Sequence, residues 1–221
     1  MTIVQHEHAP ENCPKCWAKL ATPLFCETCQ HMLESSQTLS PFRALGIPPT
    51  YELNAMALRK RLLALSRRLH PDFHANADPA TQGLALRNSA ELNSAFEVLS
   101  DDVRRADWLV KSLAGPSEEE ERSMPSAFLA EVLEWNEAIE AARRDPEDGT
   151  LRAALDELER KLDDERRRTM AEVARMLSPL PPARSETLRS IRKHLNAVRY
   201  IDRARHEISE LALRRSSATP C

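Results

Sequence analysis

Apolar residues recur every three or four positions along most of this 221-residue chain, a spacing that lines one face of an α-helix. The first such stretch is short: it follows Ser40, a favoured N-cap, and stops at Gly46, a favoured helix end. Asn54 can cap a longer second helix, which ends before Pro71 because proline disfavours the helical conformation of the preceding residue. The apolar positions of this second helix are Met56, Leu58, Leu62, Leu65 and Leu69.

Two further helices follow before the middle of the chain. After a polar stretch, a third helix is marked by Leu84, Leu92, Phe96 and Leu99. Ser100-Asp101 then caps a fourth, with its apolar side made by Trp108, Leu109 and Leu113.

The C-terminal half predicts a bundle of three amphipathic helices. Gly115-Pro116-Ser117 and the run Glu118 to Glu121 indicate a hydrated linker, and Ser123 or Ser126 can cap the helix that follows. The three helices end near Arg144, Leu177 and Leu213, with breaks at prolines and Gly149. Short connections between amphipathic helices favour an antiparallel bundle. The predicted organisation is 1–39, 40–114, a linker at 115–124, a bundle at 125–213 and a frayed tail at 214–221.

Composition supports an all-α protein. There are 4 Gly and 15 Pro, and aromatic residues make up 5% of the chain, whereas Ala, Leu, Arg and Glu dominate. A formal net charge of −3 gives no global attraction to nucleic acid. No stretch is apolar for long enough to cross a bilayer, and the N-terminus lacks the features of a secretion signal. These features predict a cytoplasmic protein with no membrane partner.

Four cysteines form two Cys-x-x-Cys pairs, Cys13/Cys16 and Cys26/Cys29. The two-residue gap in each pair lets a tight turn direct both thiolates at one ion, so the two pairs together supply four ligands. This predicts a closed, structural zinc site with Trp17 and Phe25 packed around it. Metal binding would supply the folding energy that so short a segment lacks. A redox dithiol is the alternative, but no strand precedes either pair. A zinc module could also bind nucleic acid, although few Lys or Arg surround these cysteines.

The second predicted helix carries charge of one sign. There is no acidic residue between Asn54 and His70, so the basic residues gain nothing from i,i+4 ion pairs. A docking surface for an acidic partner explains such a run, and its attraction would weaken in salt. The basic residues are Arg59, Lys60, Arg61, Arg67 and Arg68.

The stretch from Ser40 to about Leu113 resembles the J domain of the DnaJ superfamily. The resemblance implies an antiparallel helix pair with His70-Pro71-Asp72 at its tip, where this loop stimulates ATP hydrolysis by a DnaK/HscA-class chaperone. Pro71 would fix the turn, Asp72 would offer a carboxylate to a partner arginine, and His70 would support the loop or contact the partner. The matching motifs are Phe42, Leu45 and Gly46, the basic helix, His70-Pro71-Asp72, Asn93-x-Ala95-Phe96-x-x-Leu99 and Arg104-Arg105-Ala106.

Nearly the whole chain resembles the HscB family of co-chaperones for iron–sulfur cluster assembly. The matching motifs are Arg105-Ala106-x-Trp108-Leu109 and Phe128-Leu129-x-Glu131-x-Leu133-Glu134-x-x-Glu137. The family implies a J domain, made of a helical hairpin and two short helices, joined to a C-terminal three-helix bundle, here with an N-terminal zinc module. It also implies an apolar patch for an IscU-type scaffold protein, formed by Leu129, Leu133 and Tyr200 and rimmed by Glu134 and Glu137.

Three positions depart from the family pattern. Ala130 stands where methionine is frequent, Ala141 stands where an acidic residue is frequent, and Phe73 lies one place early. The first two bear on scaffold affinity, whereas chaperone docking should be unaffected by the third.

The expected function is therefore that of a co-chaperone rather than an enzyme, since the sequence has no nucleophile–base pair or phosphate loop. The alternatives are a J protein for a different client, or a zinc-dependent nucleic-acid-binding or redox protein. The sequence leaves the particular chaperone and scaffold, the oligomeric state, the partner of the zinc module and the role of Cys221 open.

Overall fold

The computed structural model describes residues 11–34, 39–145 and 148–218, with the backbone alone described at 126–127, 129–130 and 214–218. These ranges contain helices and two isolated β-bridges but no strand, as the composition predicts. The chain divides into two compact units, Met1–Leu109 and Val110–Cys221. The helices are α1 (Pro41–Leu45), α2 (Ala55–Leu69), the 3₁₀ turn η1 (Pro71–His74), α3 (Pro79–Ser100), α4 (Asp102–Ser112), α5 (Ser126–Arg144), α6 (Gly149–Leu177) and α7 (Glu186–Ala218).

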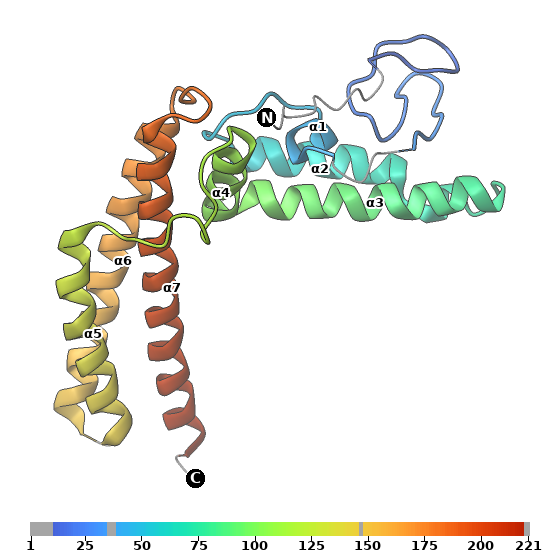
Figure 1. Cartoon of the computed structure of the whole chain (residues 1–221). Helices are drawn as coiled ribbons and strands as arrows, with labels where there is room; N and C mark the ends of the chain where they lie inside the picture. The colour runs from blue at the N-terminus through green and yellow to red at the C-terminus, as the bar shows by residue number, and fades with distance from the viewer. Residues whose placement is uncertain (1–10, 35–38, 146–147, 219–221) are drawn as a thin grey trace. The chain divides into compact units, whose positions relative to one another are not determined.

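The first unit is built on the helical hairpin α2–α3, with η1 between the two helices and α1 packed against both (Figure 1). Local capping sets the helix ends. Asn54 accepts a hydrogen bond from the N–H of Ala57 at 2.9 Å, and Asp78 accepts two from the first turn of α3. Asp101 caps α4 through the N–H of Arg104 at 2.8 Å. Gly46 ends α1 with a φ of 64°, which is a left-handed conformation that glycine tolerates.

Arg105 joins α3, α4 and the segment before α2. Its guanidinium donates to the carbonyl oxygens of Leu99 and Tyr51, and it lies over the Tyr51 ring with 4.9 Å to the centroid. Nearby, the rings of Phe42 and Trp108 pack at 5.3 Å between centroids. Arg105 therefore has a structural role in the hairpin.

One residue expected on the apolar face of α2 lies on the opposite face. Met56 is 82% exposed, whereas Leu58, Leu65 and Leu69 are buried. Two residues turn an α-helix by about 200°, so Met56 and Leu58 cannot face the same neighbour.

The second unit is a three-helix bundle of α5, α6 and α7, side by side in Figure 1. Asn136 bonds Tyr200 and Arg143 bonds Glu207, both pairs 64 residues apart, so α5 and α7 run parallel with α6 antiparallel to both. Tightly packed apolar side chains form its core: Phe128, Val132, Trp135, Ile139, Ala142, Leu155, Leu158, Leu162, Ala197, Ile201, Ala204 and Ile208.

Two helix boundaries in this unit differ from the sequence prediction. Pro125 occupies the N-cap of α5 with no side-chain cap. Of the two expected capping residues, Ser123 hydrogen-bonds Glu121 and Ser126 is the first residue of the helix. Helix α7 continues to Ala218 beyond the expected end at Leu213, since no helix breaker precedes Pro220.

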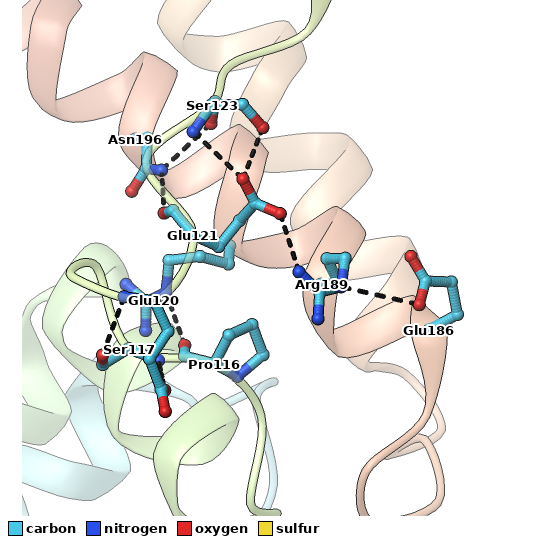
Figure 2. A network of polar contacts seen from close by, with 9 residues as sticks. Pro116, Ser117, Glu120, Glu121, Ser123, Glu186, Arg189 and Asn196 are labelled. Carbon is cyan, nitrogen blue, oxygen red and sulfur yellow. Dashed lines mark hydrogen bonds and ion pairs between the residues drawn. The ribbon is translucent and has the colours of Figure 1, made fainter.

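The segment before α5, expected to be a hydrated linker, is fastened to α7 (Figure 2). Asn196 donates to the carbonyl oxygens of Glu121 and Ser123 at 2.8 and 3.0 Å, and buried Arg192 donates to that of Pro116 at 3.0 Å. Hydrogen bonds from the Ser123 side chain and from Arg189 lower the pKa of Glu121 to about 2, so this carboxylate stays charged at neutral pH. We call residues 115–124 the strap.

Candidate functional site

The four paired cysteines converge on one point. Their Sγ atoms all lie within 4.8 Å of one another, and the Cys13–Cys29 and Cys16–Cys26 distances are both 3.6 Å. Tetrahedral zinc with thiolate bonds of about 2.3 Å separates its sulfurs by about 3.8 Å. The donor set and its geometry therefore fit a four-coordinate metal ion.

The two halves of this cluster are built alike. In each half, the carbonyl of the first cysteine accepts the N–H four residues later at 2.8 Å, from Trp17 in one and Gln30 in the other. The turn closed by each of these hydrogen bonds ends in a residue with a left-handed conformation, with φ of 61° at Trp17 and 58° at Gln30. Phe25 is buried as expected, but Trp17 is 79% exposed, because this turn directs it away from the sulfurs.

Thiol ionisation in the cluster is uneven. The N–H of Cys29 lowers the pKa of Cys26 to about 6. The N–H of Ala18 lowers the pKa of Cys16, but burial and hydrogen bonds with the three other cysteines outweigh it and raise that pKa to about 12. Crowded thiols resist joint ionisation, and a bound cation would relieve this.

The cysteine segment is packed onto the helical hairpin rather than held apart from it. Asn88 of α3, 1% exposed, donates to the carbonyl oxygens of Leu24 and Leu33 at 2.7 and 2.9 Å. The buried Thr22 hydroxyl donates to the Ala44 carbonyl at 2.7 Å. A Cβ on Gly46 would lie 2.2 Å from the carbonyl oxygen of Ala21, so only glycine permits this approach. Sequence reasoning missed Asn88, because its partners lie 55 and 64 residues away.

The His70-Pro71-Asp72 loop lies at the tip of the hairpin, where α2 is connected to α3. His70 ends α2 in an extended conformation, and Pro71 and Asp72 begin η1. The His70 Nδ1 accepts the N–H of Asp72 at 3.3 Å, while the Asp72 side chain remains 87% exposed. His70 thus contacts both the backbone N–H and, at 3.5 Å, the carboxylate of Asp72, and that carboxylate remains accessible to solvent. Phe73 beside it is 73% exposed.

Three of the five predicted basic residues share one face of α2 with exposed apolar side chains. Arg59, Lys60 and Arg67 line a shallow groove of about 440 Å³ together with Met56 and Leu63. Met56 and Leu63 are 82% and 52% exposed. This mixture of cationic and apolar groups, which we call the α2 face, suits a protein partner rather than a small charged ligand.

The other two predicted basic residues point elsewhere. Arg61 donates through Nε to the Leu45 carbonyl at 2.9 Å. It also pairs at 3.4 Å with Glu27, which lies between Cys26 and Cys29 in the sequence. It therefore joins α2 to the cysteine segment. Arg68 is exposed but lies outside the lining of the groove, and its carbonyl bonds the His74 ring at 3.0 Å.

In the second unit, exposed Leu133 and half-buried Tyr200 lie on facing parts of α5 and α7. Leu133 is 66% exposed and lies one turn from Asn136, whose side-chain amide donates to the Tyr200 hydroxyl at 2.9 Å. The Tyr200 ring packs edge-on against Phe128, 6.2 Å between centroids. The side chain of Leu129 lies outside the described residues.

The two predicted acidic rim residues do not share this face equally. Glu134 and Glu137 are both exposed. Helix geometry turns Glu137 about 40° from Leu133, whereas Glu134 is about 100° away, on the side opposite Asn136. Glu137 is thus the closer neighbour of the Leu133–Tyr200 surface.

Within the described ranges, every helix is too short or too polar to span a bilayer.

Comparison with known families and structures gives one consistent result. Residues 124–209 match the family model described as the HSCB C-terminal oligomerisation domain. The co-chaperone protein HscB homolog of Bordetella petrii is 31% identical over 137 residues, which is 62% of this chain and 77% of that protein. The homolog of Mannheimia succiniciproducens is 36% identical over 103 residues, 46% of this chain and 60% of that protein.

Two solved structures share the fold. The human co-chaperone protein HscB aligns with a TM-score of 0.72 at 19% identity, covering 92% of this chain and 99% of the human chain. Chaperone HscB from Vibrio cholerae aligns with a TM-score of 0.63 at 24% identity, covering 80% of this chain and 99% of the Vibrio chain. Fold, C-terminal domain and sequence relatives agree: the chain belongs to the HscB co-chaperone family.

Proposed function

We propose that this chain is a J-domain co-chaperone that stimulates ATP hydrolysis by a DnaK/HscA-class chaperone and delivers an IscU-type iron–sulfur scaffold protein to it. The observation that carries the first half is the solvent-exposed Asp72 carboxylate, held at the end of a helical hairpin beside a face of one charge sign. Membership of the HscB family supports the second half.

The chaperone contact combines charge with apolar surface. Arg59, Lys60 and Arg67 attract an acidic partner over several ångströms and speed its approach. Met56 and Leu63 supply the apolar area that holds the complex once it has formed. The Asp72 carboxylate then accepts hydrogen bonds from a chaperone arginine, while His70 keeps the loop in shape.

We expect Met56→Ser combined with Leu63→Ser to raise the half-saturating co-chaperone concentration roughly 30-fold, if each side chain contributes about 1 kcal/mol on burial. Maximal ATPase stimulation should be retained, because the loop is untouched. Titrating the ATPase rate against co-chaperone measures both quantities. Leu86→Ser on α3, where the leucine is 62% exposed, is the matched control. Equal titration curves for the double variant and wild type would exclude the α2 face as the contact.

The four cysteines hold zinc in this proposal, and the ion supplies structural cross-linking without an open coordination position. Cys13, Cys16, Cys26 and Cys29 are the ligands. Asn88 and Arg61 then fasten the segment to α3 and α2.

The scaffold protein binds the Leu133–Tyr200 surface in this proposal. Leu133 is exposed and Tyr200 is fixed by Phe128 and Asn136, which lowers the entropy lost on binding. Leu129 would extend the same surface.

We expect Leu133→Ala to weaken scaffold binding about tenfold with no loss of folding, since an exposed leucine contributes little to the core but can anchor an interface. Calorimetric titration with the purified iron–sulfur scaffold measures the change. Leu213→Ala on α7, where the leucine is 67% exposed, is the control. If wild type itself does not bind the scaffold while ATPase stimulation is intact, the chain is a J protein for a different client.

A further inference from the structure

A groove runs between the strap and α7, beside Tyr200. Its volume is about 770 Å³, and its walls come from α7 on one side and the strap on the other. Asn196, Arg199, Tyr200 and Arg203 recur at helical spacing, so α7 contributes one continuous stripe. Asn196 lines the groove and donates hydrogen bonds to the strap, so the two walls are joined there.

Two arginines in this groove differ from most arginines of the second unit. Arg122 and Arg203 are exposed, and neither guanidinium forms an ion pair with any residue in the described ranges. Arg199 in the same groove pairs with Glu118. Arginines elsewhere in the unit also have acidic partners: Arg143, Arg160, Arg166, Arg167, Arg168, Arg175, Arg189 and Arg205.

The groove is continuous with the surface already proposed for the scaffold protein. Tyr200 lines the groove with one side and bonds Asn136 of α5 with its hydroxyl. Met124 adds an apolar side chain to the same wall. Glu137, about 100° around α5 from Asn136, is exposed. The combined surface therefore has an apolar centre, a flank along the groove where four basic side chains outnumber Glu118 and Glu119, and an anionic flank on α5.

We propose that the groove binds an acidic segment of the scaffold protein, with Arg122 and Arg203 receiving its carboxylates. Arginine presents a planar fork that matches a carboxylate, and its weak hydration makes it suited to an interface. The opposite charges on the two flanks would fix the orientation of the partner on the bundle, because rotating the partner would bring like charges together. This inference rests on the proposed scaffold-binding function.

The test is a calorimetric titration of the full chain with the purified iron–sulfur scaffold at about 25 mM and about 500 mM salt, where the Debye length falls from roughly 20 Å to roughly 4 Å. Arg122→Glu with Arg203→Glu should weaken binding about tenfold at low salt, and the difference from wild type should largely vanish at high salt. The charge-matched control is Arg160→Glu with Arg167→Glu, on exposed α6 positions. Circular dichroism should give the same helix content for all variants.

Leu133→Ala separates failure of this inference from failure of the proposed function. Weaker binding by Leu133→Ala, with the groove variant unchanged relative to its control, would overturn the groove and leave the scaffold site standing. Unchanged binding by both variants would overturn both. The chain could instead bind a single-stranded 20-nucleotide RNA more tightly than it binds the scaffold. If the groove variant lost that RNA binding, the groove would be assigned to nucleic acid.

Discussion

Asp72→Asn is expected to reduce ATPase stimulation of the DnaK-class chaperone to the unstimulated rate. The Asp72 side chain is 87% exposed and contacts the His70 ring at 3.5 Å, so the substitution removes charge with little change in shape. The loop geometry should survive, because His70 is bonded to the backbone N–H of Asp72. Leaving a buried partner arginine without its carboxylate costs about 2–5 kcal/mol, roughly 30-fold or more in affinity.

Measuring phosphate release at saturating ATP across a range of co-chaperone concentrations checks this expectation. Glu97→Gln is the control, since this exposed glutamate on α3 loses the same charge and makes only a 3.9 Å contact with Arg104. Stimulation by Asp72→Asn equal to that by wild type would show that the loop does not act through its carboxylate.

Metal removal is expected to lower the thermal stability of the first unit by at least about 10 °C. Structural zinc supplies about 10–16 kcal/mol of apparent folding energy to small cysteine modules, so the segment should unfold without it. The buried Asn88 amide would then lose both of its carbonyl acceptors and the Thr22 hydroxyl would lose its place against α1. A loss of only 2 kcal/mol shifts the melting temperature of a small domain by about 8–16 °C.

The measurement is bound metal by mass spectrometry together with a thermal melt, for wild type, Cys26→Ser and Cys221→Ser. Cys221 lies outside the described residues and belongs to neither Cys-x-x-Cys pair, so its variant controls for loss of a thiol alone. Asn88→Leu keeps the ligands and should retain metal while melting earlier. A metal-free Cys26→Ser chain that melts like wild type would contradict a stabilising role for the cluster.

Features set by a few neighbouring residues were predictable from the sequence. Gly46, Asn54 and Asp101 end or begin helices where expected, because capping depends on the backbone within about four residues. The four cysteines converge as their spacing predicts, because each pair is confined to one tight turn.

Features set by distant partners were not predictable from the sequence. The acidic run at 118–121 suggested a solvated linker, because its arginine partners on α7 lie up to 81 positions away in the chain. Arg61 looked like its basic neighbours, although Glu27 and Leu45 hold it. Trp17 was expected beside the sulfurs, but the left-handed turn that completes the first cysteine pair directs it to solvent.

The most direct test of the central claim is the steady-state ATPase rate of the DnaK-class chaperone with this chain, with and without the iron–sulfur scaffold protein. We predict stimulation by the chain alone, a further increase when the scaffold is added, and neither effect with Asp72→Asn. An unchanged ATPase rate in every condition, with a folded chain and a chaperone that responds to another J protein, would contradict this claim.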